Sequence, residues 1–244
     1  MGLFDKKYCD VYGEKIGILG NRKLEDGNLC KNCAGKLSPF FSERRSSTVE
    51  EIREQLAYRK ANQEQVDAFN PTKVLGGDMK IYFDGDRKQW LASRARSWRG
   101  ANPDVLSFSQ VMGCDVDADE SKRELKRKNP EGKEVSYVPP RYEYSYDFYV
   151  TIHVNSPWFS QIRFQVNDDE IHQRGGIAYR EAQKNADEIR QALLQVRDAE
   201  REAVLSCMRR SRASCALTAA PRRRRMPAAA ASIAALLSAG ELAA

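Results

Sequence analysis

Hydrophobic and polar residues alternate with a period of two through the middle of the chain, from residue 74 to residue 167. The clearest run is RYEYSYDFYVTIHVN at residues 141–155, in which every second residue from Tyr142 to Val154 is aromatic or aliphatic. Such alternation predicts a long strand with one buried face. The turn-forming NSPW then leads into QIRFQVN, which alternates in the same way, so the two runs are predicted to pair as an antiparallel hairpin.

Shorter alternating runs precede this hairpin. MKIYFD and QWLAS, at residues 79–84 and 89–93, are separated by the turn-like sequence GDRK. In VLSFSQVMGCDVD, at residues 105–117, the apolar side chains of one parity are predicted to share a buried face: Leu106, Phe108, Met112, Cys114 and Val116. We therefore expect about six strands in an antiparallel β domain at residues 73–170.

A helical period replaces the alternation on both sides of the β domain. A helix is predicted from about Thr48 to about Ala68, with Ser47 and Glu50 at the spacing of a capping box and Pro71 ending the pattern. A second, amphipathic helix is predicted within residues 171–206. Its apolar stripe comprises Ala182, Ala186, Ile189, Leu193 and Val196.

These elements predict an α+β fold. A small cysteine-rich module at 1–45 is followed by a helical linker at 46–72, the β domain and the C-terminal helix. The order of elements resembles that of bacterial pleckstrin-homology-like barrels, which commonly dock peptides or lipids. The C-terminal helix is expected to pack on its own β domain, and a coiled-coil dimer through 177–206 is the alternative interpretation.

The basic balance of the chain is confined to its end. The 244 residues have a formal charge of +6, but residues 208–244 contain seven arginines and one glutamate, which is +6 by itself. Residues 1–207 therefore hold 33 basic and 33 acidic side chains. This neutral body lacks the general basic surface that binding to a phosphate backbone usually requires.

The N-terminal residues lack the apolar run of a secretory signal, and no stretch of about 20 apolar residues is present to span a bilayer. We therefore expect a soluble cytoplasmic protein. In that compartment, closely spaced cysteines are more often metal ligands than disulfides.

The cysteines of the N-terminal module have almost the spacing of a zinc ribbon. Cys30 and Cys33 form a complete Cys-x-x-Cys pair, whereas Cys9 is followed by Tyr12 at the position of the second cysteine. The 17 residues between Tyr12 and Cys30 fall within the range expected between two such pairs. Zinc-ribbon sites use four ligands in a tetrahedron, so Tyr12 alone departs from the pattern.

Residues 8–45 resemble the bacterial zinc-ribbon-like domain of unknown function 4428. The resemblance rests on the cysteine spacing, on Gly13 directly after the first pair, and on the phrase KLEDGNLCKNC followed by KLS. Proteins of that family have cysteine at the position of Tyr12. The resemblance implies a metal-binding fold and no established cellular role.

Tyr12 is expected to be a poor ligand, because a phenol titrates near pH 10 and is longer than a cysteine side chain. Cys9, Cys30 and Cys33 are predicted to bind Zn²⁺ structurally but weakly, with water or a carboxylate such as that of Asp10 in the fourth place. A degenerate ribbon that folds without metal, or a pair of reactive thiols, is the alternative.

Other candidates for chemistry lack a supporting pattern. His153 and His172 are expected to be solvent-facing, and Cys114 is expected to be a core thiol. Trp98 lies among arginines and is interpreted as the anchor of a loop rather than a platform for a base. No catalytic residues are predicted.

The expected function is therefore that of a non-enzymatic zinc-binding adaptor with an unknown protein partner. A nucleic-acid-binding zinc-ribbon protein is the alternative, and a zinc-dependent hydrolase that uses the open coordination position is the third hypothesis.

Residues 207–244 are rich in arginine and alanine and are expected to form a disordered tail. If the codons are read one base earlier, Cys215 to Ala235 can encode a second pair of Cys-x-x-Cys motifs.

We predict that a frameshift upstream of Cys215 replaced a C-terminal zinc ribbon. Sequencing of the gene is expected to show paired cysteines in that frame, and stop codons there would contradict the hypothesis.

Overall fold

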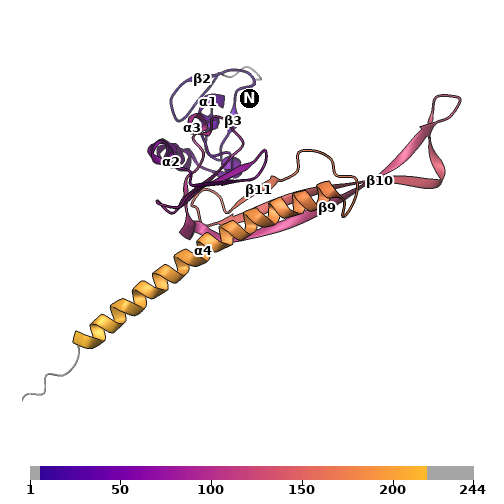
Figure 1. The fold of residues 1–244 in the computed structure, drawn as a ribbon. Coiled ribbons are helices and arrows are strands. Elements are labelled where there is room, and N and C mark those ends of the chain that lie inside the picture. The colour runs from indigo at the N-terminus through magenta and orange to yellow at the C-terminus, as the bar shows by residue number, and fades with distance from the viewer. Residues whose placement is uncertain (1–5, 219–244) are drawn as a thin grey trace, which may run out of the picture. The chain divides into compact units, whose positions relative to one another are not determined.

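The computed structural model describes residues 6–218, with side-chain environments up to residue 209. It is a mixed α+β fold, as predicted from the sequence, and Figure 1 shows its elements. The helices are α1 (Lys31–Ala34), α2 (Val49–Ala68), α3 (Trp98–Ala101) and α4 (Ile177–Thr218), with 3₁₀ turns at Arg44–Ser46 and Phe108–Gln110. The strands are β1 (Lys7–Tyr8), β2 (Lys15–Ile16), β3 (Arg22–Lys23), β4 (Asn28–Leu29), β5 (Lys73–Leu75), β6 (Lys80–Asp84), β7 (Gln89–Ser93), β8 (Leu106–Ser107), β9 (Val111–Lys128), β10 (Glu134–Val154) and β11 (Gln161–Gln165).

The β domain consists of two separate antiparallel sheets. One has the strand order β5-β6-β7-β8 and the other has the order β11-β10-β9. The prediction of a pleckstrin-homology-like barrel is wrong, because neither sheet closes on itself and β8 does not pair with β9. The 3₁₀ turn at Phe108–Gln110 separates these two strands and redirects the chain from one sheet to the other.

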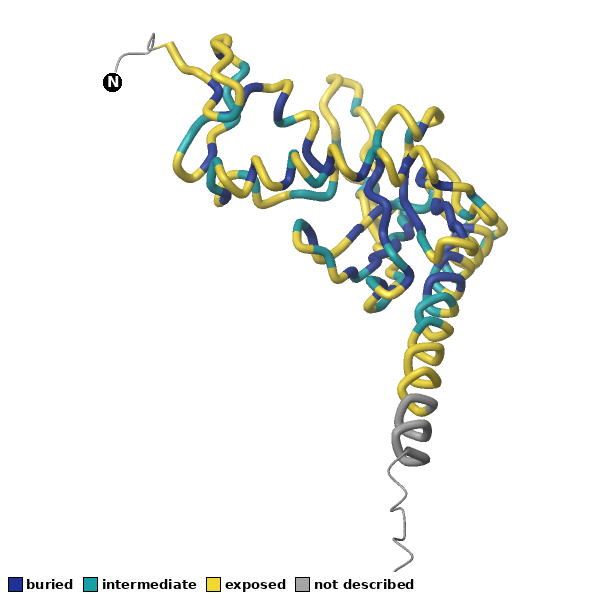
Figure 2. The backbone as a smooth tube through the Cα atoms, turned by 90° about the vertical axis from the view of Figure 1, so that its left-hand side faces the viewer, coloured by how far each residue is buried: buried dark blue, intermediate teal, exposed yellow. Residues whose placement is uncertain are grey.

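The main hydrophobic core lies between the two sheets and α4. β6 and β7 contribute Ile81 and Trp90, and α4 contributes Ala186, Ile189 and Leu193. Figure 2 shows the buried positions on the strands and on the earlier turns of α4. The predicted apolar stripe of this helix therefore packs on its own β domain.

α4 is longer than predicted. It begins at Ile177 and continues to Thr218, beyond the expected end at residue 206. Residues 207–218 are thus helical, although they were assigned to a disordered tail. The rest of that tail, residues 219–244, lies outside the described part of the chain. No helix among the described residues is long and apolar enough to cross a bilayer.

The predicted hairpin of β10 and β11 is confirmed, with Ile152 opposite Ile162. The buried face begins at Tyr146, whereas Tyr142 and Tyr144 are exposed despite sharing its parity. β11 pairs only with residues 149–153 of β10, so the earlier part of β10 has no third strand beside it. Alternation therefore identified the strand correctly but not the extent of its burial.

The parity predicted for Met112 is wrong. Its side chain is 50% exposed, whereas Val111 and Cys114 are buried. The register between β9 and β10 shifts between the pairs of His153 and Val154, which inserts an extra residue at this point. Such a bulge reverses the direction of the side chains that precede it.

The predicted helix of residues 48–68 is confirmed by α2. Its capping box lies one residue later than expected. Thr48 Oγ1 accepts a hydrogen bond from the Glu51 backbone N–H, and the Glu51 carboxylate accepts one from the Thr48 N–H. Ser47 instead donates its hydroxyl to the carbonyl of Glu43.

A buried polar network joins α2 to the cysteine-rich module and to the loop that precedes β8. Arg59 forms an ion pair with Asp104 at 2.9 Å, and both side chains are almost completely buried. Asp104 also accepts a hydrogen bond from the hydroxyl of Ser38 at 2.7 Å, and Arg59 Nε donates to the carbonyl of Lys36 at 3.2 Å. Burial raises the pKa of Asp104, and the charge of Arg59 opposes that rise.

Asn62 extends the same network one turn further along α2. Its amide nitrogen donates to the carbonyl of Pro103 at 2.8 Å, and its amide oxygen accepts from the backbone N–H of Val105 at 2.9 Å. The loop that precedes β8 is therefore held to α2 by hydrogen bonds that water does not reach.

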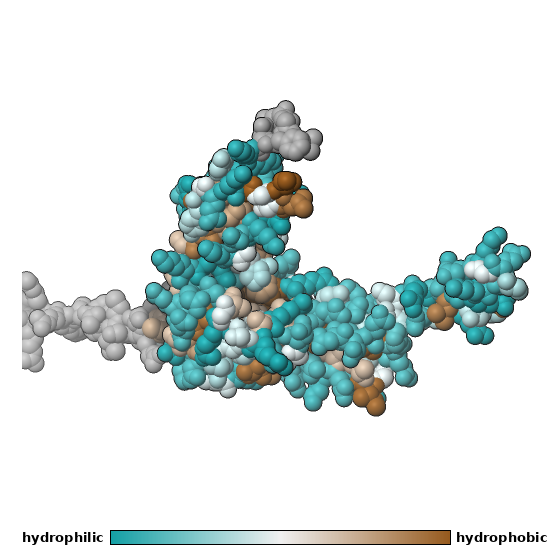
Figure 3. Space-filling model, turned by 90° about the horizontal axis from the view of Figure 1, so that it is seen from above, coloured by the Kyte–Doolittle hydropathy of each residue, from teal (hydrophilic) through white to brown (hydrophobic). Residues whose placement is uncertain are grey.

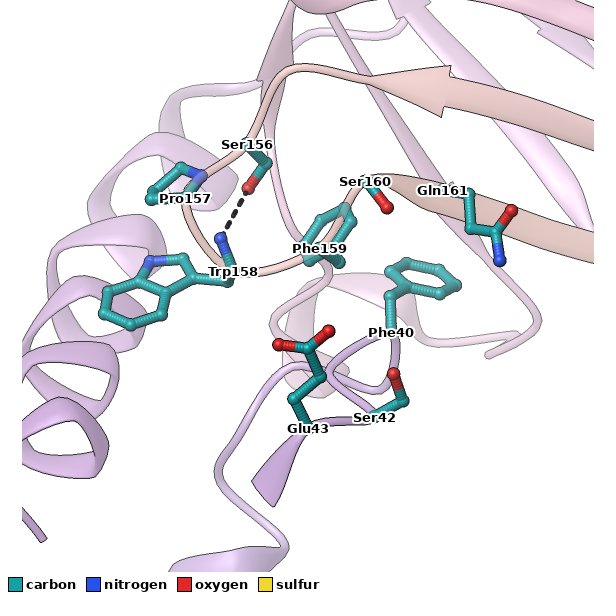
Figure 4. A pocket seen from close by; sticks show the side chains of 9 residues that line it. All are labelled: Phe40, Ser42, Glu43, Ser156, Pro157, Trp158, Phe159, Ser160 and Gln161. Carbon is teal, nitrogen blue, oxygen red and sulfur yellow. Dashed lines mark hydrogen bonds between the residues drawn. The ribbon is translucent and has the colours of Figure 1, made fainter. Parts of the chain in front are cut away.

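Aromatic contacts connect the cysteine-rich module and α2 to the loop between β10 and β11. Phe40, near the end of the cysteine-rich module, lies with its ring centroid 5.5 Å from that of Phe159 in the β10–β11 loop. Figure 4 shows both rings at a shallow pocket that Ser156, Trp158 and Gln161 also line. Trp158 in turn contacts Tyr58 of α2 at a centroid distance of 6.1 Å.

We predict that Asp104→Ala lowers the free energy of unfolding by about 3–5 kcal/mol, because it leaves the Arg59 guanidinium buried without a counter-charge. The double variant Arg59→Met/Asp104→Ala is expected to recover part of this loss. Chemical denaturation measures both values.

Glu50→Ala is the matched control, because it removes an exposed ion pair with Arg53 on the same helix. It is expected to change stability far less than Asp104→Ala. Equal losses for the two variants would show that the buried pair has no special role.

Candidate metal centre

Two short hairpins and one helical turn position the three N-terminal cysteines. β1 pairs with β2 and ends just before Cys9, while β3 pairs with β4, and β4 ends just before Cys30. The hairpins are joined where the Asp10 N–H donates to the carbonyl of Asn28 at 2.9 Å. Cys33 lies in α1, for which Cys30 is the N-cap.

The sulfur atoms of Cys9, Cys30 and Cys33 converge. All three lie within 4.8 Å of one another. The Sγ atom of Cys33 is 3.7 Å from that of Cys9 and 3.2 Å from that of Cys30. Thiolates bound to tetrahedral zinc at about 2.3 Å are about 3.8 Å apart. The three cysteines are therefore close enough to bind one metal ion, with a small opening of the Cys30–Cys33 pair for zinc.

Backbone N–H groups are directed at two of these sulfurs. The Cys33 N–H donates to Cys30 Sγ at 3.4 Å. Burial raises the pKa of the Cys9 thiol, but backbone N–H groups of Cys30, Tyr12 and Val11 donate to it and bring the pKa below its ordinary value. This pattern of donors favours the thiolate, which is the form that binds metal.

Cys33 has the opposite electrostatic environment. Burial and its contacts with the sulfurs of Cys30 and Cys9 raise the pKa of its thiol to about 12. Three thiolates in one buried cluster repel one another unless a cation lies among them. A divalent cation among the sulfurs removes that repulsion, so the donor set fits such an ion.

The first cysteine turn keeps its shape although Tyr12 replaces its second cysteine. The Gly13 N–H donates to the Cys9 carbonyl at 2.7 Å, and Gly13 has a φ of 72°, which glycine adopts without strain. Tyr12 directs its backbone N–H toward Cys9 Sγ. Its side chain is 60% exposed, and the ammonium of Lys36 lies 5.5 Å from its ring centroid.

Asp10 does not supply the fourth ligand suggested from the sequence. Its Oδ2 atom accepts a hydrogen bond from the Asn28 backbone N–H at 2.6 Å, and it is not part of the converging group. The carboxylate thus joins the two hairpins instead of completing the metal site. Three protein sulfurs remain as the ligand set among the described residues.

The hydrophobic core around the cysteines is small and includes the start of α2. It contains Leu24, Leu29 and Leu37 from the module and Ile52 from α2. α2 approaches so closely that a Cβ atom at Gly27 would lie 2.6 Å from Val49 Cγ2. The first turns of α2 therefore belong to the same packed unit as the cysteines.

The other residues considered from the sequence do not join this site. His153 pairs with Asp115 at 2.8 Å and His172 with the carbonyl of Tyr144 at 3.2 Å, and both are partly exposed. Cys114 is buried in the main core, as predicted. Trp98 is buried against Phe69 and Tyr82, so its ring is not presented to a base.

Residues 7–55 match the family described as domain of unknown function DUF4428. The match confirms the resemblance noted for residues 8–45 and extends it into α2, in agreement with the shared core. No curated protein and no solved structure is significantly similar to the chain.

We predict that Tyr12→Cys tightens zinc binding at least tenfold, because the turn already brings the backbone N–H of residue 12 to Cys9 Sγ and a thiolate at this position supplies the fourth ligand of the tetrahedron. The variant is also expected to melt at a higher temperature in the presence of zinc. Competition with a chromogenic chelator measures the affinity.

Tyr12→Phe is the matched control, since it removes only the phenol oxygen. Because the Tyr12 side chain is exposed, this variant is expected to bind zinc like the unaltered protein. Weaker binding by Tyr12→Phe would show that the phenol is a ligand after all.

Proposed function

We propose that Cys9, Cys30 and Cys33 bind one structural Zn²⁺ ion and that the protein is a non-enzymatic interaction protein. The convergence of the three sulfurs is the observation that carries this proposal. Cysteine sulfur is a ligand that favours zinc over magnesium or calcium. A water molecule is the expected fourth ligand, since Asp10 is engaged with Asn28.

The burial of the cysteines supports a structural rather than a catalytic role. Cys9, Cys30 and Cys33 are 1%, 6% and 2% exposed. The sulfurs lie inside the small core of the module, and the Asp10 carboxylate is hydrogen-bonded to the Asn28 N–H instead of being free to activate a zinc-bound water. The module packs its few apolar residues around this centre, so zinc is expected to stabilise the fold directly.

The rest of the chain offers surfaces to a partner. Hydrolysis at the zinc is the less favoured function for the reason just given. A protein partner was the first expectation from the neutral body, and nucleic acid was the alternative. The apolar stripe of α4 is covered by the β domain. A coiled-coil dimer through that part of residues 177–206 is therefore not favoured.

We predict that chelation of zinc lowers the thermal midpoint of unfolding and that restored zinc reverses the effect. Zinc at about 100 times its dissociation constant stabilises the folded state by about 2.7 kcal/mol. The protein is expected to hold close to one zinc per chain, and Cys33→Ser is expected to lose it. Elemental analysis and calorimetry measure the two effects.

Cys207→Ser serves as the control for cysteine replacement, because Cys207 is exposed in α4 and does not belong to the cluster. It is expected to retain the full zinc content. If the metal content of Cys33→Ser equals that of Cys207→Ser, the cysteine cluster is not the zinc site.

A further inference from the structure

The strands β9 and β10 continue beyond β11 as a two-stranded ribbon. β11 pairs only with residues 149–153, whereas the β9–β10 pairing extends through Ser121–Ser145 to Lys128–Glu134. We name residues 122–144, which lie beyond the Ser121–Ser145 pair, the β arm. Figure 1 shows its two strands continuing to their connecting turn without a third strand beside them.

The β arm contains the excess positive charge of the folded body. It holds seven basic and four acidic residues, a net charge of +3. Since residues 1–207 are neutral, the rest of that segment has a net charge of −3. The neutral total concealed a separation of charge that becomes visible only when the ribbon is identified. Figure 3 shows hydrophilic residues covering most of the visible surface of this ribbon.

Most of the cations on the β arm have no carboxylate partner in the described structure. Arg123 pairs with Glu143 and Lys133 with Glu131. The remaining five basic side chains of the arm form no ion pair among the described residues: Lys122, Lys126, Arg127, Lys128 and Arg141. All five are exposed, so they remain available to an anionic partner.

Tyrosine rings order several of these cations. The guanidinium groups of Arg127 and Arg141 lie 6.0 and 4.8 Å from the ring centroid of Tyr137. The ammonium of Lys122 lies 3.9 Å from the centroid of Tyr142. Cation–π contacts of this kind reduce side-chain freedom and do not use the hydrogen-bond donors of the cation. The arm therefore presents partly ordered donors for phosphate oxygens.

The edges of the arm are poorly suited to pairing with another strand. Pro139 and Pro140 lie in β10 where its register with β9 shifts between Ser136 and Arg141. Prolines, irregular register and exposed lysines all oppose strand addition. The side chains of the arm, rather than its backbone edges, are the feature that a partner would bind.

We propose that the β arm binds double-stranded DNA by entering its major groove. The groove is about 12 Å wide and admits a two-stranded β ribbon. Each strand of the arm contributes seven paired residues, which at about 3.4 Å each give a ribbon of roughly 24 Å, shorter than one helical turn of about 34 Å. DNA binding would specify the partner of the proposed interaction protein, so this proposal rests on the proposed function.

The test uses the zinc-loaded full chain and a fluorescein-labelled 20-base-pair DNA of mixed sequence. Fluorescence anisotropy between 50 and 200 mM salt gives the affinity and its salt dependence. The triple variant Lys126→Gln/Arg127→Gln/Lys128→Gln is expected to bind at least tenfold more weakly at 50 mM salt. Its slope of log K against log salt is expected to be shallower by about 2.7, because each phosphate contact contributes about 0.9.

The matched control is Lys60→Gln/Lys73→Gln/Lys80→Gln. It makes the same change in net charge at exposed positions outside the arm. Both triple variants retain the arginine-rich residues 208–244, so the contribution of that segment cancels between them. The control is expected to leave affinity and slope close to those of the unaltered protein. Thermal melting and zinc content of each variant confirm that the fold is retained.

Equal effects of the two triple variants would overturn the proposal, because the arm would then add nothing beyond net charge. Tighter or equal binding to a matched RNA duplex would also overturn it, since the major groove of A-form RNA is too narrow for side chains to read. A protein that holds zinc but binds no DNA refutes the β arm proposal alone. A protein that holds no zinc refutes the proposed metal site, whatever its affinity for DNA.

Discussion

The buried ion pair between Arg59 and Asp104 joins three segments that are separate in the sequence: the cysteine-rich module, α2 and the loop before β8. Neither charge reaches water, so each requires the other and the hydrogen bonds that surround them. Ser38 and the carbonyl of Lys36 connect this pair to the cysteine-rich module, and Asp104 belongs to the loop before β8. α2 was predicted to be a linker at residues 46–72. In the structure it is also a packed element, with Ile52 in one core and Val66 in another.

The metal site depends on this arrangement because its own core is small. The module holds its three cysteines by backbone hydrogen bonds, and α2 supplies part of the apolar cover through Val49 and Ile52. Replacement of the fourth cysteine by Tyr12 leaves the turn intact, since the turn needs only the backbone N–H of that residue and the freedom of Gly13. A ribbon can therefore lose one ligand and keep the geometry of the other three.

Charge is distributed on the body in a way that its total does not reveal. The β arm has a net charge of +3 and the rest of residues 1–207 has a net charge of −3, and five cations of the arm form no ion pair among the described residues. Net charge governs average attraction, whereas binding to a polyanion depends on the local density of cations along one surface. The neutral composition of residues 1–207 argues against binding to nucleic acid, whereas the concentration of positive charge on the β arm favours it.

Periodicity and ligand spacing are local properties, so they were enough to predict the α+β class, α2, the β10–β11 hairpin, the apolar stripe of α4 and the group of three cysteines. It did not determine the Arg59–Asp104 pair, whose partners are 45 residues apart and have ordinary local surroundings. It also misjudged Met112, Tyr142 and Tyr144, since a bulge and a missing third strand decide their burial. Sheet closure, burial and the pairing of charges depend on contacts between segments that are far apart in the chain, so local patterns could not predict them.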